Sequence, residues 1–150
     1  MGFTILKPVH ILWINLITDT MPAIALGMED AEKGVMQRPP RSRKESIFAD
    51  GLGFDIMFQG FIIAGITILS YFVGHRIESG AWEIAESADG MTMAFLTLSM
   101  VEIFHSFNMR SRVASLFGMK KQNGMLWLTL AFSLVVTAAV VFIPFLNRLF

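Results

Sequence analysis

The chain has 150 residues, a formal net charge of zero and no cysteine. Hydrophobic residues make up 54% and charged residues 16%, against roughly 45–50% and 25% in soluble proteins, so the composition favours a membrane protein. The neutral net charge argues against nucleic acid as a partner. The absence of cysteine excludes disulfide frameworks, thiolate metal sites and thiol nucleophiles.

Four windows of the sequence are apolar enough to cross a bilayer as helices. They run over about residues 9–28, 52–74, 91–107 and 125–145. A bilayer needs about 20 mostly apolar residues per helix, with about 17 as the lower limit. A soluble protein of this size could not bury four helices that are apolar on all sides. We therefore predict an all-α polytopic membrane protein with four transmembrane helices in a bundle.

The first window is the most polar, and it contains a carboxylate, Asp19, near its middle. Asp at the centre of a membrane helix costs about 2.5–3.5 kcal/mol on translocon scales, so it must face protein, water or an ion. Asn15 and Thr18 share a helical face with it. Amide, hydroxyl and carboxylate oxygens suit hard cations such as Ca²⁺, Mg²⁺ or Na⁺. The alternative is that these side chains only form hydrogen bonds between helices.

Pro22 strengthens the prediction of a cation site. It lies four residues after Thr18, so it has no N–H for the Thr18 carbonyl to accept, and its ring favours an unwound or kinked helix. Free backbone oxygen at membrane depth is tolerated only where it lines a cavity or is buried in protein. Broken helices beside oxygen ligands are how many transporters build ion sites at the midplane.

In the second window, Gly60 and Ala64 have a spacing that favours close packing against another helix. The third window is the shortest, and the fourth contains no charged residue.

The charges predict the orientation of the four helices. Nine of the twelve Lys and Arg residues fall in the loops 29–50 and 109–123, which four crossings place on one side of the membrane. The positive-inside rule makes these two loops cytoplasmic and puts both termini outside. A chain that begins outside at a polar helix, without a signal peptide, is expected to be a piece of a larger protein.

Two motifs resemble the C-terminal membrane region of P-type ATPases, and most closely the calcium-transporting branch. The first is Leu6-Lys-Pro-Val-His-Ile-Leu-Trp-Ile-Asn-Leu-Ile-Thr-Asp-Thr-Met-Pro-Ala-Ile-Ala-Leu-Gly27, and the second is Met36-Gln-Arg-Pro-Pro-Arg41. The resemblance covers nearly the whole chain and implies that the windows are transmembrane helices six to nine of a ten-helix pump. It also implies an integral membrane protein, which we expect in the plasma membrane.

The resemblance implies ligands for a transported Ca²⁺ ion. Asn15 and Asp19 match ligands of one calcium site, and Thr18 and Asp19 match ligands of a second, so Asp19 would bridge both. Glu102 matches the carboxylate that the eighth helix of two-site pumps supplies. His105 stands one turn later, where Asn is common in two-site pumps. It either occupies the second site with its charge or only hydrogen-bonds Glu102, so the number of ions per cycle stays open.

The resemblance also implies parts that these 150 residues do not contain, namely the phosphorylation and nucleotide-binding domains and the remaining helices of the calcium cage. We expect Mg²⁺ and ATP to act only through those domains. The partners would be the remaining helices and cytoplasmic domains of the same pump, together with the lipid bilayer. By itself the chain is expected neither to hydrolyse ATP nor to bind calcium tightly, since calcium takes about 6–8 oxygen ligands.

Two other interpretations stay open. One is a free-standing four-helix membrane protein that assembles with or regulates a partner and transports nothing. The other is a pump fragment for Na⁺ or Mn²⁺, because a cluster of oxygen ligands does not name its cation.

Overall fold

Helices are the only regular secondary structure in the described part of the chain. The computed structural model describes residues 3–30, 35–37, 40, 44, 46, 48–49, 51–110 and 122–147. The elements are α1 (Pro8–Trp13), the π-helix η1 (Ile14–Asp19), α2 (Thr20–Gly27), the short 3-10 helix η2 (Val35–Gln37), α3 (Leu52–Ser79), α4 (Ala88–Asn108), α5 (Gly124–Phe142) and α6 (Pro144–Asn147). Most of the loops predicted at 29–50 and 109–123 lies outside the described residues.

Within the described residues, four helices are long and apolar enough to cross a membrane, which confirms the predicted fold class. The first is one continuous span, Pro8–Gly27, made of α1, η1 and α2 in succession. The helix α3 continues to Ser79, five residues beyond the predicted end of its window. It ends at Gly80, whose φ of 76° is a left-handed conformation that glycine adopts without steric cost. The helix α5 ends at Phe142, two residues before Pro144 begins α6.

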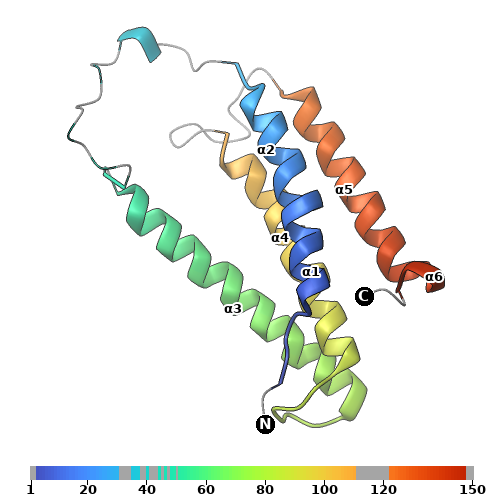
Figure 1. The fold of residues 1–150 in the computed structure, drawn as a ribbon. Helices are drawn as coiled ribbons and strands as arrows, with labels where there is room; N and C mark the ends of the chain where they lie inside the picture. The colour runs from blue at the N-terminus through green and yellow to red at the C-terminus, as the bar shows by residue number, and fades with distance from the viewer. Residues whose placement is uncertain are drawn as a thin grey trace.

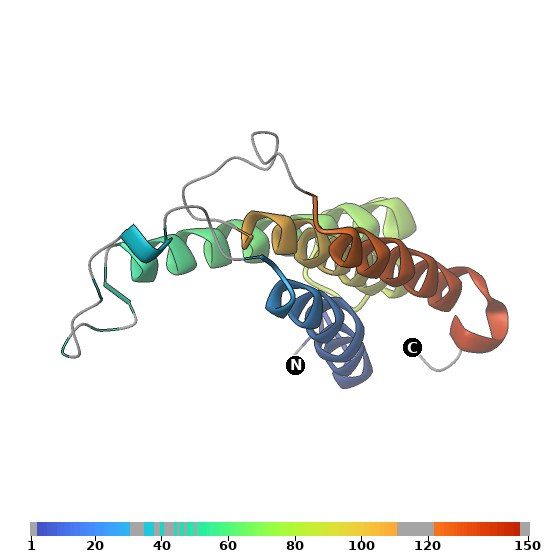
Figure 2. The same ribbon diagram turned by 90° about the horizontal axis from the view of Figure 1, so that it is seen from above.

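The helices form a bundle with two distinct ends (Figure 1). We call the end where α2 and α4 finish and α3 and α5 begin the basic end, because the Lys- and Arg-rich segments 28–51 and 109–123 join the helices there. We call the opposite end the acidic end, after the Glu-containing connection 80–87 between α3 and α4. Viewed from above, the span from α1 to α2 lies on one side of a row formed by α3, α4 and α5 (Figure 2).

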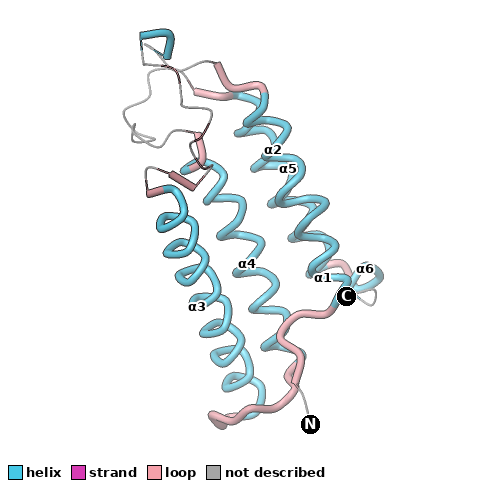
Figure 3. The backbone as a smooth tube through the Cα atoms, turned by 60° about the vertical axis from the view of Figure 1, so that its left-hand side comes forward, coloured by secondary structure: helices cyan, strands magenta, loops and turns pink. Residues whose placement is uncertain are grey.

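The helix α4 holds the bundle together. It packs against α3 along much of its length, and it also contacts η1, α2 and α5 (Figure 3). Towards the acidic end, Ile14, Phe95 and Val140 form one buried apolar cluster between η1, α4 and α5. Towards the basic end, Ala25, Phe107 and Leu126 form a second cluster between α2, α4 and α5. The two clusters therefore hold the span that carries the predicted ligands in place, one towards each end of it.

The helices α3 and α4 approach each other closely at two glycines near the acidic end. A Cβ added at Gly74 on α3 would lie 2.8 Å from the Asp89 carbonyl oxygen and 2.9 Å from the Gly90 Cα on α4. A Cβ added at Gly60 would meet nothing within 4 Å. The close packing expected from Gly60 and Ala64 is therefore wrong for the contacts within this chain, because α3 meets α4 tightly two to four turns further on.

Candidate ion site

The span that carries the predicted ligands widens into a π-helix over Ile14–Asp19. Pro22 has no N–H, so it can complete neither the α-helical bond to the Thr18 carbonyl nor the π-helical bond to the Ile17 carbonyl. The predicted disturbance of the helix is present, but it takes the form of a wider turn rather than an unwound segment. π-helices are rare and occur frequently at functional sites.

Hydroxyl groups bond several backbone carbonyls in and beside the π-helix. The Thr18 hydroxyl donates to the Ile14 carbonyl at 2.8 Å, and the Thr20 hydroxyl donates to the Asn15 carbonyl at 2.7 Å. From α5, the Ser133 hydroxyl donates to the Ile17 carbonyl at 3.3 Å. This bond supplies a donor to one of the two carbonyls that Pro22 cannot reach.

The helix α5 therefore presents a polar stripe to the ligand-bearing span. Thr129, Ser133 and Thr137 recur every four residues and are all buried. The Trp13 indole N–H donates to the Thr137 hydroxyl at 3.4 Å, one turn from the Ser133 contact. The sequence analysis missed this stripe, although the four-residue spacing of hydroxyls in an otherwise apolar window is a signal that could have revealed it.

The structure separates the three predicted ligands of the first span. Asn15 and Asp19 are exposed along the helix, whereas Thr18 is 1% exposed and is packed inside the bundle. The hydroxyl of Thr18 keeps two lone pairs while it donates its proton, so it can still accept a bond or a cation. Asp19 and Asn15 present their oxygens on the side that these helices leave uncovered.

The fourth predicted ligand, Glu102, stands half-buried on α4. Its helix contacts η1, the segment that ends at Asp19. The sequence predicted these carboxylates on separate helices, and the fold brings them to one region of the bundle. His105 lies one turn further along α4 and is half-buried too.

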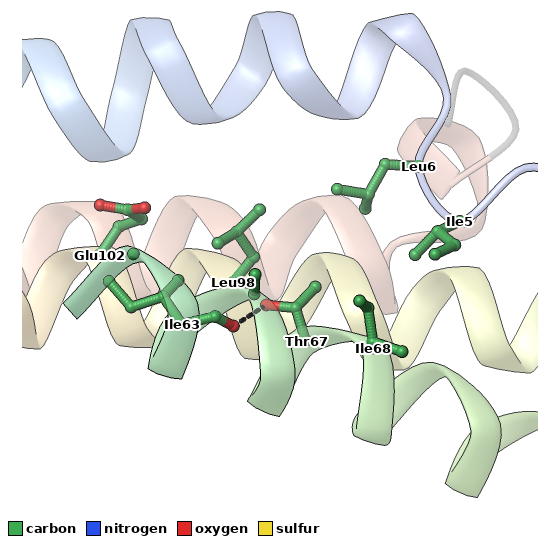
Figure 4. A pocket seen from close by; sticks show the side chains of 9 residues that line it. Ile5, Leu6, Ile63, Thr67, Ile68, Leu98 and Glu102 are labelled. Atoms are coloured by element: carbon green, nitrogen blue, oxygen red, sulfur yellow. Dashed lines mark hydrogen bonds between the residues drawn. The ribbon is translucent and has the colours of Figure 1, made fainter. Parts of the chain in front are cut away.

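Glu102 also lies at one end of an open groove of about 440 Å³ between α3, α4 and the segment before α1 (Figure 4). Thr67 is the other polar residue that lines the groove. The remaining lining residues are apolar: Ile5, Leu6, Gly60, Ile63, Ala64, Ile68 and Leu98. The Thr67 hydroxyl donates to the Ile63 carbonyl of its own helix at 2.8 Å. The groove thus gives Glu102 an apolar wall on one side.

The donor set of the described residues is a partial one. No group of three or more His, Cys, Asp or Glu side chains converges in the described ranges. The candidate site has two carboxylates, one amide and one hydroxyl, all of them oxygen donors of the kind that hard cations prefer. Calcium takes about 6–8 oxygens, so further donors would be needed to complete its shell.

Comparisons with known proteins agree with the geometry. Residues 3–150 match the family model described as cation transporting ATPase, C-terminus. The chain is 35% identical to calcium-transporting ATPase 1 of Bacillus cereus over 98% of its own length and 18% of that protein's. It is 37% identical to the calcium-transporting ATPase of Bacillus subtilis over 97% of its length and 16% of that protein's. A calcium-transporting ATPase of Listeria monocytogenes is 39% identical over 73% of the chain and 12% of its own length.

The chain thus spans less than a fifth of the length of these relatives. The match covers all four membrane-length helices and the π-helix between α1 and α2. The chain belongs to the C-terminal membrane region of the cation-transporting P-type ATPases.

Proposed function

We propose that the chain is part of the ion-translocating membrane domain of an ATP-driven calcium pump. In this proposal Asp19 is the central ligand of the transported Ca²⁺, and Asn15, Thr18 and Glu102 supply further oxygens. The observation that supports the proposal is the π-helix Ile14–Asp19, which ends at an intramembrane carboxylate three residues before Pro22 and contacts α4, the helix that carries Glu102.

Electrostatics favours a cation between these two helices. Two carboxylates that lie close together in a region of low dielectric repel each other, and a cation or a proton between them removes that repulsion. The oxygen-only donor set selects hard cations. The names of the relatives narrow these cations to calcium, and that step rests on similarity.

The remaining ligands would come from other helices of the same pump. Asn15 and Asp19 are exposed in this chain, and the groove beside Glu102 is open. The same pump would also contain the domains that use Mg²⁺ and ATP. The isolated chain would then be inactive, with no ATP hydrolysis and no tight binding of calcium. We place the basic end in the cytoplasm, following the charge distribution of the loops. We further propose the plasma membrane as the membrane that holds the protein.

The test is calcium activation of ATP hydrolysis by the transporter that contains this chain, with Asp19→Asn as the decisive variant. The substitution keeps the size of the side chain and removes its charge, so we expect activation at micromolar calcium to be lost. Asp55→Asn is the matched control, because Asp55 is an exposed carboxylate in the first turn of α3. Activation by Mn²⁺ or Na⁺ in place of Ca²⁺ would identify a pump for another ion. Wild-type calcium activation in Asp19→Asn would refute the assignment of the ligand.

The number of ions per cycle depends on His105. If its charge occupies a second site, His105→Asn should raise the calcium bound at equilibrium from one to two ions per pump. Unchanged stoichiometry in that variant would show that His105 does not block a site.

A further inference from the structure

An arginine at the basic end has a buried side chain and partners that are less buried. The side chain of Arg110, two residues after the end of α4, is only 1% exposed, and that of Glu29 is 24% exposed. Its Nη2 donates to Glu29 Oε1 at 2.6 Å, and its Nε lies 3.2 Å from each of the two Glu29 oxygens. Its Nη1 donates to Gln122 Oε1 at 3.2 Å. The guanidinium therefore uses its planar fork to join the residues after α2 to the residues before α5.

Asn123 completes the same network. Its side-chain nitrogen donates to Glu29 Oε2 at 2.6 Å and to the Ala25 carbonyl at 2.9 Å. Its side-chain oxygen accepts the Leu126 N–H at 3.1 Å, which makes it the N-cap of α5. One amide thus binds the last turn of α2 and the first turn of α5 together. We call Glu29, Arg110 and Asn123 the Arg110 clamp.

The clamp strongly favours the packing seen here. A buried guanidinium that loses its carboxylate remains as an uncompensated buried charge, which is highly unfavourable. Hydrogen bonds from Arg110 and Asn123 hold the pKa of Glu29 below its ordinary value, so the carboxylate stays ionised. Beneath the clamp, Ala25 and Phe107 pack in the apolar cluster of the basic end.

The clamp lies just beyond the ends of the two helices that lead to the candidate carboxylates. Glu29 follows Asp19 by ten residues, of which the first eight form α2, about 12 Å of helix. Arg110 follows Glu102 by eight residues, of which the first six complete α4. A change in the separation of α2 and α4 at the basic end would therefore be transmitted to the gap between Asp19 and Glu102.

We propose that Arg110 is a positioning residue for ion binding, because the Arg110 clamp holds α2 and α4 at the separation at which Asp19 and Glu102 share one cation. The inference rests on the proposed function for the identity of the cation. It adds a role for three residues that do not contact the ion. Arginine is needed because a lysine ammonium cannot bind both oxygens of Glu29 in the plane of a fork.

The first experiment measures calcium activation of the intact transporter in Arg110→Lys, Arg110→Ala and Glu29→Gln. We expect the calcium concentration for half-maximal activation to rise about threefold to tenfold. Replacing a residue that directly supports a metal ligand typically lowers metal affinity by about tenfold or more, and Arg110 acts from further away. The maximal rate per folded molecule should change much less. The exchange Glu29→Arg with Arg110→Glu should recover part of the loss. Arg76→Ala is the matched control, because Arg76 lies at the acidic end and stacks on Trp82 at 5.1 Å.

The second experiment measures the separation of the helices directly. These 150 residues contain no cysteine, so spin labels can be attached at Ile24→Cys on α2 and Phe104→Cys on α4, which are 54% and 58% exposed. Cysteines elsewhere in the transporter are replaced. The distance distribution between the labels should broaden or shift in Arg110→Ala and stay narrow in Arg76→Ala.

The two experiments separate the clamp from the proposed function. A wild-type calcium response and an unchanged distance distribution in the clamp variants, with only a lower thermal midpoint, would overturn the positioning role. If the wild-type transporter shows no calcium activation, the proposed function fails. The distance measurement then tests the clamp by itself, and a distribution that neither broadens nor shifts in Arg110→Ala overturns it.

Discussion

Replacing Gly74 by alanine is expected to weaken the packing of α3 against α4, although alanine is the better helix former. Gly74 is buried, and its added Cβ would lie 2.8 Å from the Asp89 carbonyl oxygen and 2.9 Å from the Gly90 Cα. Both neighbours are backbone atoms, so no side-chain rotation can relieve the contact. The two helices would have to move apart by several tenths of an ångström to reach ordinary contact distances of about 3.5 Å.

The magnitude follows from a comparison within the same helix. Gly65 is exposed, and a Cβ added there would meet nothing within 4 Å. Both substitutions gain the intrinsic helix preference of alanine over glycine, about 0.8–1 kcal/mol. Only Gly74→Ala adds an overpacking cost, about 1–3 kcal/mol. We therefore expect Gly65→Ala to be neutral or stabilising, and Gly74→Ala to be about 1–3 kcal/mol less stable than Gly65→Ala.

The assay is the free energy of unfolding in mixed micelles, titrated with a denaturing detergent and followed by circular dichroism and tryptophan fluorescence. Gly65→Ala serves as the reference because it changes the same atoms in the same helix. Equal free energies of unfolding for the two variants would refute the tight α3–α4 crossing. A larger loss in Gly65→Ala would place the close contact of α3 elsewhere.

Two further predictions concern the ligand-bearing span and the basic end. Ser133→Ala removes the hydroxyl that bonds the Ile17 carbonyl, so we expect the free energy of unfolding to fall by about 1 kcal/mol; no change would mean that another group satisfies this carbonyl. Because Arg110 and then Asn123 lower the pKa of Glu29 from its usual value near 4.5, the carboxylate stabilises the fold above that pH. This contribution is lost as the pH falls through the lower, folded-state pKa. Unfolding measured from pH 7 to pH 3 should show this loss in the wild type and lack it in Glu29→Gln, and identical curves would contradict it.

Hydropathy alone predicted the four membrane-length helices. A span that crosses a bilayer must satisfy its backbone internally and keep its side chains apolar, so its signal is local and strong. The same reason singled out Asp19, because a carboxylate within an apolar span is costly enough to require a function or a partner. The boundaries were less well predicted, since α3 continues past Gly74 until Gly80 allows a left-handed turn.

The form of the disturbance at Pro22 could not be read from the sequence. The sequence shows that Pro22 has no N–H to donate. A wide helical turn and an unwound segment can both accommodate the missing hydrogen bond. Bonds from Thr18, Thr20 and Ser133 accompany the wide turn, and the last of these comes from a helix 116 residues away in the chain. The burial of Thr18 beside an exposed Asp19 belongs to that same packing.

What the sequence by itself determined is the helical membrane class, the location of an intramembrane carboxylate and the family. The tertiary structure alone decided which glycine meets a neighbouring helix and which hydroxyls of α5 contact the ligand-bearing span. It also decided that Glu29 and Arg110, 81 residues apart, form a part-buried ion pair. The reason is physical: the cost of a charge or a backbone group in a bilayer is set by the local segment, whereas a contact between helices depends on their relative rotation and separation.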